Sequence, residues 1–140
     1  MNWLIWALLS AIFAGLTAVL AKVGVEAVNS NLATAIRTTV VLVFVWAIAL
    51  CTVPLAAAGE VSRRTWIFLT LSGLATGLSW LCYFRALQLG EASRVAPIDK
   101  LSVVLVAVFA VLFLGERPSL PNWLGIVLIA AGAVLVGWRR

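Results

Sequence analysis

Five long stretches of this chain contain no charged residue, and they constrain the fold more than any other feature. A bilayer core of about 30 Å needs around 20 helical residues, and four of the stretches reach or nearly reach that length. The sequence therefore predicts an integral membrane protein. The five stretches are Trp3 to Ala21, Thr38 to Ala58, Trp66 to Phe84, Leu101 to Gly115 and Pro118 to Trp138.

The composition supports lipid as the main solvent of this chain. Only 11% of the 140 residues are charged and 64% are hydrophobic, whereas a soluble domain carries about 25% charged residues. A soluble chain of this size has no means of hiding so much apolar surface. The net charge of +5 comes from basic residues scattered between apolar segments, and a nucleic-acid surface would need them clustered. We therefore expect no nucleic-acid partner.

Breaks between the stretches define the expected helices. A turn at Asn29–Asn31 can cap the second helix, and Gly115 and Pro118 end the fourth. Polar loops at Gly59–Arg64 and Gly90–Arg94 complete a set of short connections, so neighbouring helices run antiparallel. No basic segment precedes Trp3, so we expect the first stretch to remain as a helix. The prediction is one all-α domain over residues 1–140, with membrane-spanning helices over residues 3–28, 32–57, 65–88, 94–115 and 120–138.

Tryptophans support these spans. Trp3, Trp66 and Trp123 each open an odd-numbered helix, which places all three at one membrane face. Trp138 closes the last helix at the other face. Interfaces favour tryptophan because its ring is apolar while its N–H needs a partner.

The fourth stretch is too short to cross the membrane. Its 15 residues span only about 22 Å, so the helix must begin near Ser93 or Arg94, and Asp99 and Lys100 then lie about one and a half turns inside it. Intramembrane charges are costly unless they pair or face water. We therefore expect a polar vestibule here, with Asp99 as its ion-coupling group.

Three further cations lie inside the expected helix ends toward the same membrane face: Lys22, Arg37 and Arg85. Their long side chains can also reach the interface from a turn inside the membrane, so snorkelling remains an alternative for them. Asp99 has a short side chain that reaches the interface poorly.

The third helix carries a polar and aromatic stripe. Thr76, Trp80 and Tyr83 follow i, i+4, i+7 spacing, which places them on one face. They are expected to line a solute cavity, with ordinary core packing as the alternative. The expected solute-binding residues are Lys22, Thr76, Trp80, Tyr83, Arg85 and Lys100.

Glycines mark expected helix contacts. Gly73 and Gly77 form a GxxxG pair in the third helix, and Gly125 and Gly132 lie one heptad apart in the fifth. Such residues let helix backbones approach closely in lipid, either within one chain or across a dimer.

Enzyme chemistry is not indicated. The chain has no histidine, no pair of carboxylates deep in the membrane and no phosphate-binding loop. Cys51 and Cys82 lie in apolar segments without metal-ligand company and are expected to be reduced packing residues. We expect no catalytic residue, no cofactor and no metal.

Several motifs resemble the EamA domain of the drug/metabolite transporter superfamily. They are the run Ala86 to Pro97 (ALQLGEASRVAP), the FLGE ending at Glu116, the WLGI beginning at Trp123, and Ala131-Gly132. Arg37 also sits where that family often has an arginine. The resemblance covers residues 3–138 and implies transport of metabolites or drugs, usually export, without ATP.

Larger members of the superfamily carry two five-helix units in one chain. Because five is odd, the second unit is inverted relative to the first. The resemblance therefore implies that this single unit works as an antiparallel homodimer in a bacterial or archaeal inner membrane, with alternating access arising from inverted symmetry. Its partners are the bilayer, a second copy and a small-molecule solute.

Charge counts fit insertion in both orientations. Counting only residues outside the apolar stretches, the two faces carry three arginines each, which gives the positive-inside rule no preference. One face has Arg63, Arg64 and Arg117, and the other has Arg94, Arg139 and Arg140. The embedded cations would favour a cytoplasmic C-terminus.

The sequence departs from the small multidrug members of the superfamily, which use a glutamate deep in the first helix for proton coupling. Here that helix has no mid-membrane acid, and Glu26 lies at its end. Lys22 or Lys100 could hold a carboxylate, which favours amino-acid-like or anionic solutes. Two alternatives remain: a half-transporter with a heterodimeric partner, and a membrane scaffold or accessory subunit that transports nothing.

Overall fold

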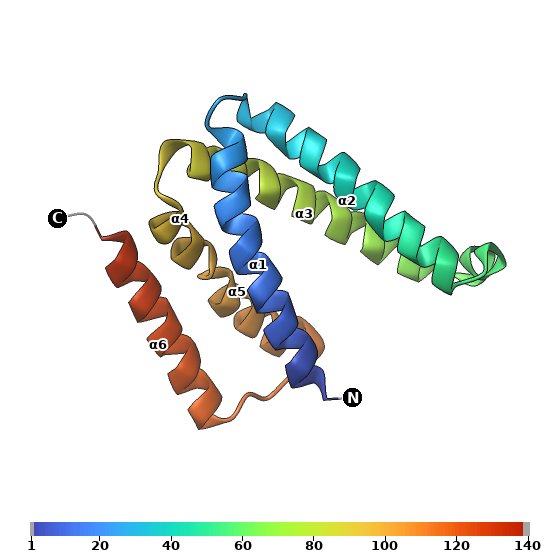
Figure 1. The fold of residues 1–140 in the computed structure, drawn as a ribbon. Coiled ribbons are helices and arrows are strands. Elements are labelled where there is room, and N and C mark those ends of the chain that lie inside the picture. Colours follow the sequence, from blue (N-terminus) through green and yellow to red (C-terminus); the bar gives the residue numbers. More distant parts are fainter. Residues whose placement is uncertain (1, 139–140) are drawn as a thin grey trace. The chain divides into compact units, whose positions relative to one another are not determined.

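A computed structural model describes residues 2–138 of the chain, and every regular element in that range is helical. Five helices are long and apolar enough to cross a membrane, so the predicted all-α architecture with five spans is confirmed. Arg139 and Arg140, which entered the charge count above, lie outside the described residues. The elements in Figure 1 are α1 (Trp3–Val25), α2 (Ser30–Thr52), η1 (Leu55–Glu60), α3 (Arg63–Leu89), α4 (Ala92–Asp99), α5 (Ser102–Phe109), η2 (Ala110–Leu114) and α6 (Leu120–Gly137).

The fourth span is discontinuous. It covers Ala92–Leu114 but changes its hydrogen-bonding pattern after Pro97, a residue that cannot donate a backbone hydrogen bond. The Lys100 N–H donates to the Pro97 carbonyl at 3.1 Å, and the Leu101 N–H donates to the Ile98 carbonyl at 3.0 Å. These i to i−3 bonds form a tight 3₁₀ turn, which separates α4 from α5 at the Asp99–Lys100 pair.

The start of α2 is capped as expected. The Asn29 side-chain oxygen accepts a hydrogen bond from the Asn31 N–H at 2.9 Å, which satisfies one of the unpaired donors of the first turn. The helix ends at Thr52 rather than near residue 57, because Pro54 stops it and η1 follows.

Glycine ends the fourth span. Gly115 has φ +69°, in the left-handed region that favours glycine. The preceding element, η2, is a π-type turn, and the Glu116 N–H closes it by donating to the Ala110 carbonyl at 3.1 Å. The predicted sharp stop at Gly115 is therefore present.

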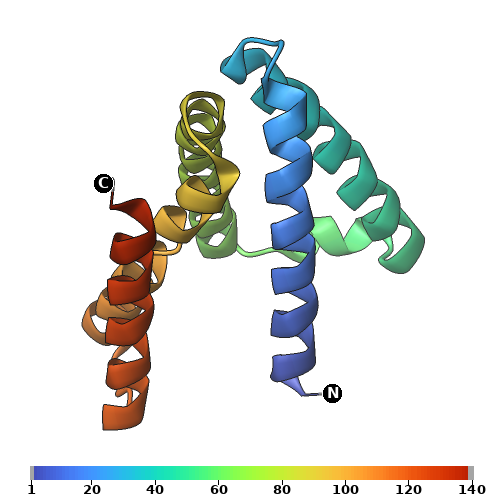
Figure 2. The same cartoon turned by 60° about the vertical axis from the view of Figure 1, so that its left-hand side comes forward.

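The chain divides into two compact units. Unit 1 comprises residues 1–20 and 89–140, and unit 2 comprises residues 21–88. In unit 1, α6 packs against α4 and α5. In unit 2, α2 and α3 lie near each other at the ends next to Ser30 and Leu89 and separate toward η1 (Figure 2). The core of unit 2 includes Val25, Phe84 and Leu87.

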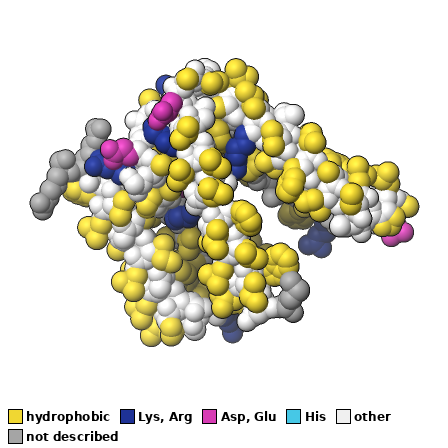
Figure 3. Space-filling view, viewed as in Figure 1, with side chains coloured by type: hydrophobic (Ala, Val, Ile, Leu, Met, Phe, Trp, Pro, Cys, Tyr) yellow, Lys and Arg dark blue, Asp and Glu magenta, His cyan; other side chains and the backbone are white. Residues whose placement is uncertain are grey.

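Few residues of the spans are buried within this chain. Only 6–11% of the residues in the apolar window of each span are buried, and hydrophobic side chains cover most of the visible surface in Figure 3. Trp3 and Trp138, at the outer ends of the first and last helices, are 77% and 74% exposed. Such a surface suits contact with lipid or with a second protein chain. Cys51 and Cys82 are free thiols, as expected, and both are exposed on this chain.

Within this chain, the four glycines expected at helix contacts have open space beside them. A Cβ added at Gly73, Gly77, Gly125 or Gly132 would meet nothing within 4 Å. At Gly137 an added Cβ would lie 2.5 Å from Cδ1 of Ile98. Gly137, which sequence reasoning did not single out, is therefore the residue that lets α6 approach α4 closely.

Candidate functional site

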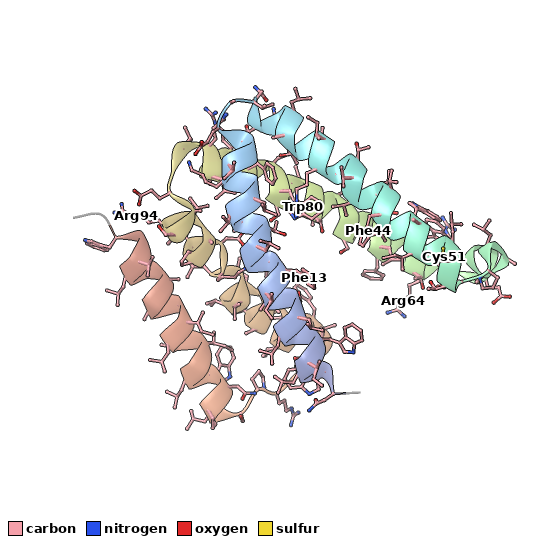
Figure 4. The ribbon with its side chains drawn as sticks, in the orientation of Figure 1. Phe13, Phe44, Cys51, Arg64, Trp80 and Arg94 are labelled. Carbon is pink, nitrogen blue, oxygen red and sulfur yellow. The ribbon has the colours of Figure 1, made fainter. Side chains whose placement is uncertain are left out.

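Three basic side chains lie near the end of unit 2 where α1 and α3 finish and α2 begins. Lys22 is near the end of α1, Arg37 is in the third turn of α2, and Arg85 is near the end of α3. Trp80, labelled on α3 in Figure 4, belongs to the same group. The short 26–29 turn joins α1 to α2, and Arg37 lies in the third turn of α2.

Lys22 is bound to the protein itself. Its ammonium Nζ donates to the Leu87 carbonyl at 2.9 Å, across 65 residues of sequence. Leu87 belongs to the last turn of α3, whose carbonyls lack helical partners. Lys22 therefore caps the C-terminal end of α3, where a positive charge also meets the negative end of the helix dipole.

Gln88 makes the reciprocal contact to α1. Its amide Nε2 donates to the Val28 carbonyl at 2.9 Å and to the Val25 carbonyl at 3.4 Å. Its Oε1 accepts a hydrogen bond from Arg85 Nη1 at 2.6 Å. Gln88 thus satisfies the Val25 carbonyl at the end of α1 and the Val28 carbonyl in the turn after it, and it holds the Arg85 guanidinium.

Arg37 has aromatic partners. Its guanidinium carbon lies 4.2 Å from the centroid of the Trp80 ring and 5.4 Å from that of Phe84. Phe84 is buried, whereas Arg37 and Trp80 are half-buried. Tyr83 is half-buried and follows Trp80 by three residues on α3.

Other predicted site residues lie elsewhere. Thr76 is exposed, and its hydroxyl donates to the Ser72 carbonyl of its own helix at 2.9 Å. Asp99 and Lys100 belong to unit 1, where their charged groups lie 3.5 Å apart. Asp99 is the eighth residue of its span, about 10 Å along the helix from Ala92. The pair therefore lies within the span and not in a connecting loop.

Ion pairs distinguish the two units. Among the described residues the ion pairs are Lys100 with Asp99 and Arg94 with Glu91, the latter at 3.2 Å, and both pairs lie in unit 1. Figure 4 labels Arg94 in α4. In the described part of unit 2, Lys22, Arg37 and Arg85 have no carboxylate within ion-pair distance. Carbonyls, an amide and aromatic rings surround these cations.

A hollow of about 320 Å³ lies in unit 2 at the other end of α2. Its lining is apolar and contains none of the predicted site residues. The lining residues are Trp46, Ala49, Leu50, Val53, Pro54, Leu55, Ala57 and Val61.

From the sequence, no binding role was assigned to Arg37 and no role to Gln88, although both belong to the same group of side chains as Lys22 and Arg85. Arg37 was recognised as an embedded charge but not as a binding residue, although its place two turns inside α2 was visible. Gln88 follows Arg85 by three positions, a spacing that puts both on one helix face. Within residues 2–138, no three or more His, Cys, Asp or Glu side chains lie close enough together to bind a metal ion.

Comparisons with known proteins identify the family of this chain. Residues 1–138 match the EamA-like transporter family. A relative from Sinorhizobium sp, an "Uncharacterized transporter in cobO 3'region", is 62% identical over 135 residues, which cover 96% of each chain. The "Uncharacterized transporter YxxF" of Bacillus subtilis is 30% identical over 138 residues, and the match covers only 43% of its length.

A third relative matches over part of the chain. The "Probable 4-amino-4-deoxy-L-arabinose-phosphoundecaprenol flippase subunit ArnE" of Yersinia pestis is 35% identical over 72 residues, which cover 51% of this chain and 63% of the relative. No solved structure matches the chain significantly. The family match, the near full-length relative and the five membrane spans agree, and the chain belongs to the EamA-like transporter family.

Proposed function

We propose that this protein is a secondary transporter that moves small metabolites or drugs across the bacterial inner membrane by alternating access, as an antiparallel homodimer of dual topology. It acts as a transporter and not as an enzyme. The observation that carries the proposal is a single five-span EamA-like unit with charged side chains inside its spans. A scaffold has no reason to keep such costly groups at that depth.

Two features support assembly from two copies. The Sinorhizobium relative has nearly the same length as this chain, whereas the match covers less than half of the Bacillus transporter. The apolar spans are exposed, and Gly73, Gly77, Gly125 and Gly132 have open space beside them. These glycines offer close-approach surfaces to a second protein in lipid.

The proposed pathway uses the embedded polar residues. Asp99 serves as the ion-coupling group, at the point where the fourth span is interrupted. Interrupted helices are typical of transporter binding sites, since their free backbone groups and charges can face a cavity. In unit 2, Thr76, Trp80 and Tyr83 are the proposed solute contacts, and Lys22 and Arg85 provide positive potential beside them. Lys100 is proposed to act with Asp99 in unit 1.

A heterodimer is the second candidate, because the Yersinia relative is named as a flippase subunit. Both candidates are transporters, but they differ in topology. A cysteine placed after Trp138, in a variant lacking Cys51 and Cys82, should react with an impermeant maleimide from both sides of the membrane if the homodimer is antiparallel. Labelling from one side only would exclude dual topology and favour a separate partner.

Transport itself is tested by flux. Resistance and metabolite-export screens in cells, followed by uptake into proteoliposomes, should show activity for the wild-type chain. Asp99→Asn should remove coupled flux while the dimer persists on size-exclusion chromatography. An identical profile for wild type and Asp99→Asn would remove Asp99 from the mechanism, and no flux with any solute would favour the accessory-subunit alternative.

A further inference from the structure

Arg37 is the basic residue of unit 2 that lies deepest in its span. It is the eighth residue of α2, about 10 Å along the helix from Ser30. Lys22 and Arg85 lie only three and four residues from the ends of α1 and α3. A charged side chain inside the bilayer costs about 2.5–3.5 kcal/mol at the centre of a span unless it has a partner or faces water.

The aromatic rings offset only part of this cost. A cation over an aromatic face gains about 0.5–2 kcal/mol, the larger values applying where both groups are desolvated. Trp80 lies at close range, and Phe84 is more distant at 5.4 Å. The two rings therefore offset part of the cost, and water or a counter-ion can offset the rest.

Stacking also leaves the donors of the guanidinium directed elsewhere. The five N–H groups of arginine lie in the plane of the guanidinium, whereas a ring beneath it contacts its face. The same planar fork matches a carboxylate or a phosphate with two parallel hydrogen bonds. A guanidinium resting on Trp80 at 4.2 Å is thus positioned to receive an anion at its edge.

The two neighbouring cations, Lys22 and Arg85, attract an anion by their charge, while their own hydrogen bonds go to protein groups. Lys22 is held by the Leu87 carbonyl, and Arg85 is held by Gln88. Both charges remain, and within the described residues neither is neutralised by a carboxylate. Unit 2 has five basic residues and only two acidic ones, Glu26 and Glu60, both of which are exposed.

We propose that Arg37 binds the carboxylate or phosphate group of the transported solute, with the Trp80 ring forming the wall beneath the guanidinium. This inference rests on the proposed transport function and narrows its substrate class to small anionic metabolites. It assigns Lys22 and Arg85 the role of holding the helix ends and providing positive potential. Quaternary ammonium compounds are excluded as preferred solutes, because two like charges would face each other.

Chemical modification of arginine tests the proposal directly. The full chain in phosphatidylcholine nanodiscs is treated with phenylglyoxal, and the modification rate of each arginine is followed by peptide mass spectrometry. Inorganic phosphate or succinate at ten times its dissociation constant should slow modification of Arg37 about tenfold. Neutral dimethyl succinate should have no effect.

Arg64 is the matched control within the same molecule. Its guanidinium also lies over an aromatic ring, that of Phe68 at 5.8 Å, but it stands in the first turn of α3. Its modification rate should not change with phosphate or succinate. Equal rates at Arg37 with and without either anion would overturn the proposal, as would the same protection at Arg64.

A second measurement separates a solute from a lipid headgroup. If nanodiscs containing phosphatidylglycerol protect Arg37 fully and succinate and phosphate then add nothing, the bound anion is a lipid and the solute assignment is wrong. Protection by succinate alone identifies a carboxylate site, and protection by phosphate alone identifies a phosphate site. Either result supports the proposal.

Variants give an independent readout. Succinate or phosphate should raise the unfolding temperature of wild type and Arg64→Gln but not that of Arg37→Gln. Arg37→Lys, which keeps the charge if Arg37→Gln fails to fold, should retain a smaller shift because lysine lacks the planar fork. Equal shifts in wild type and Arg37→Lys would contradict bidentate binding. Neither measurement requires flux, so anion protection without transport would refute the proposed function alone.

Discussion

The two units hold their charges in different ways. In unit 1, Asp99 pairs with Lys100 and Glu91 pairs with Arg94, and the partners of each pair are at most three positions apart in the sequence. In unit 2, Lys22 and Arg85 are held by a carbonyl and an amide, and Arg37 lies on aromatic rings. Figure 3 shows the basic groups of the visible face as small patches within an apolar surface.

Counting charges sharpens the contrast. The described part of unit 1 has three basic and three acidic residues, whereas unit 2 has five basic and two acidic residues. Neighbouring opposite charges reduce the cost of placing either one in a membrane, but they leave little net field. Cations held by neutral groups keep their full charge. The positive electrostatic potential of unit 2 therefore attracts anions.

The largest expected effect comes from breaking one pair in unit 1. Asp99→Leu leaves Lys100 without its carboxylate inside the fourth span and should lower stability by about 3 kcal/mol. The double replacement Asp99→Leu/Lys100→Leu should restore most of that loss, because no lone charge remains. Thermal unfolding of the purified chain in detergent measures both. If the double variant were no more stable than Asp99→Leu, the unpaired Lys100 charge would not be the cause of the lost stability.

The next effect tests the neutral partners in unit 2. Gln88→Leu removes the donor to Val25 and Val28 and the acceptor of Arg85, so we expect a loss of about 1–3 kcal/mol in unfolding free energy. Gln88→Glu is the matched control, since it keeps an acceptor for Arg85 but cannot donate to the carbonyls. The unfolding free energy of Gln88→Glu should lie between those of the wild type and Gln88→Leu. Unchanged unfolding of Gln88→Leu would mean that water replaces these contacts.

A smaller effect concerns packing in unit 1. Gly137→Ala places a methyl group against Ile98 and should cost about 1 kcal/mol, because the exposed Ile98 side chain has to shift. Gly132→Ala, in the same helix but with open space beside it, should be neutral in the monomer. Equal unfolding temperatures of the two variants would show that α6 and α4 move apart at little cost.

The smallest effect is the coupling between Arg37 and Trp80. A double-mutant cycle with Arg37→Gln and Trp80→Leu should give about 0.5–1 kcal/mol of interaction energy in unfolding experiments. The same cycle on Arg64 and Phe68, at 5.8 Å and near a helix end, should give less. If the two cycles give the same interaction energy, the contact of Arg37 with Trp80 is no stronger than that of an arginine near a helix end.

Much of the fold followed from simple patterns. Charge-free stretches predicted all five spans, and Asn29 and Gly115 marked the start of α2 and the end of the fourth span. The 3₁₀ turn after Pro97 could be anticipated only in part. A proline predicts a missing hydrogen bond, but where the helix tightens depends on which nearby carbonyls accept the remaining N–H groups.

The candidate site was less predictable. Trp80 was selected for its helical spacing, but its partner Arg37 lies on another helix, more than 40 positions away in the sequence. Lys22 was expected to contact solute, and its bond to the Leu87 carbonyl could not be read from the sequence. Contacts between helices depend on crossing angles and side-chain directions, which a helical period does not specify.

The sequence by itself determined that this chain crosses a membrane five times and that charged residues lie inside the spans, since hydropathy and helix length are local properties. Only the tertiary structure decided which groups meet those charges. Partners come from residues far apart in the chain, and the helix ends must converge before a carbonyl, an amide or a ring can reach a cation. For that reason the tertiary contacts distinguish Arg37 from its neighbours.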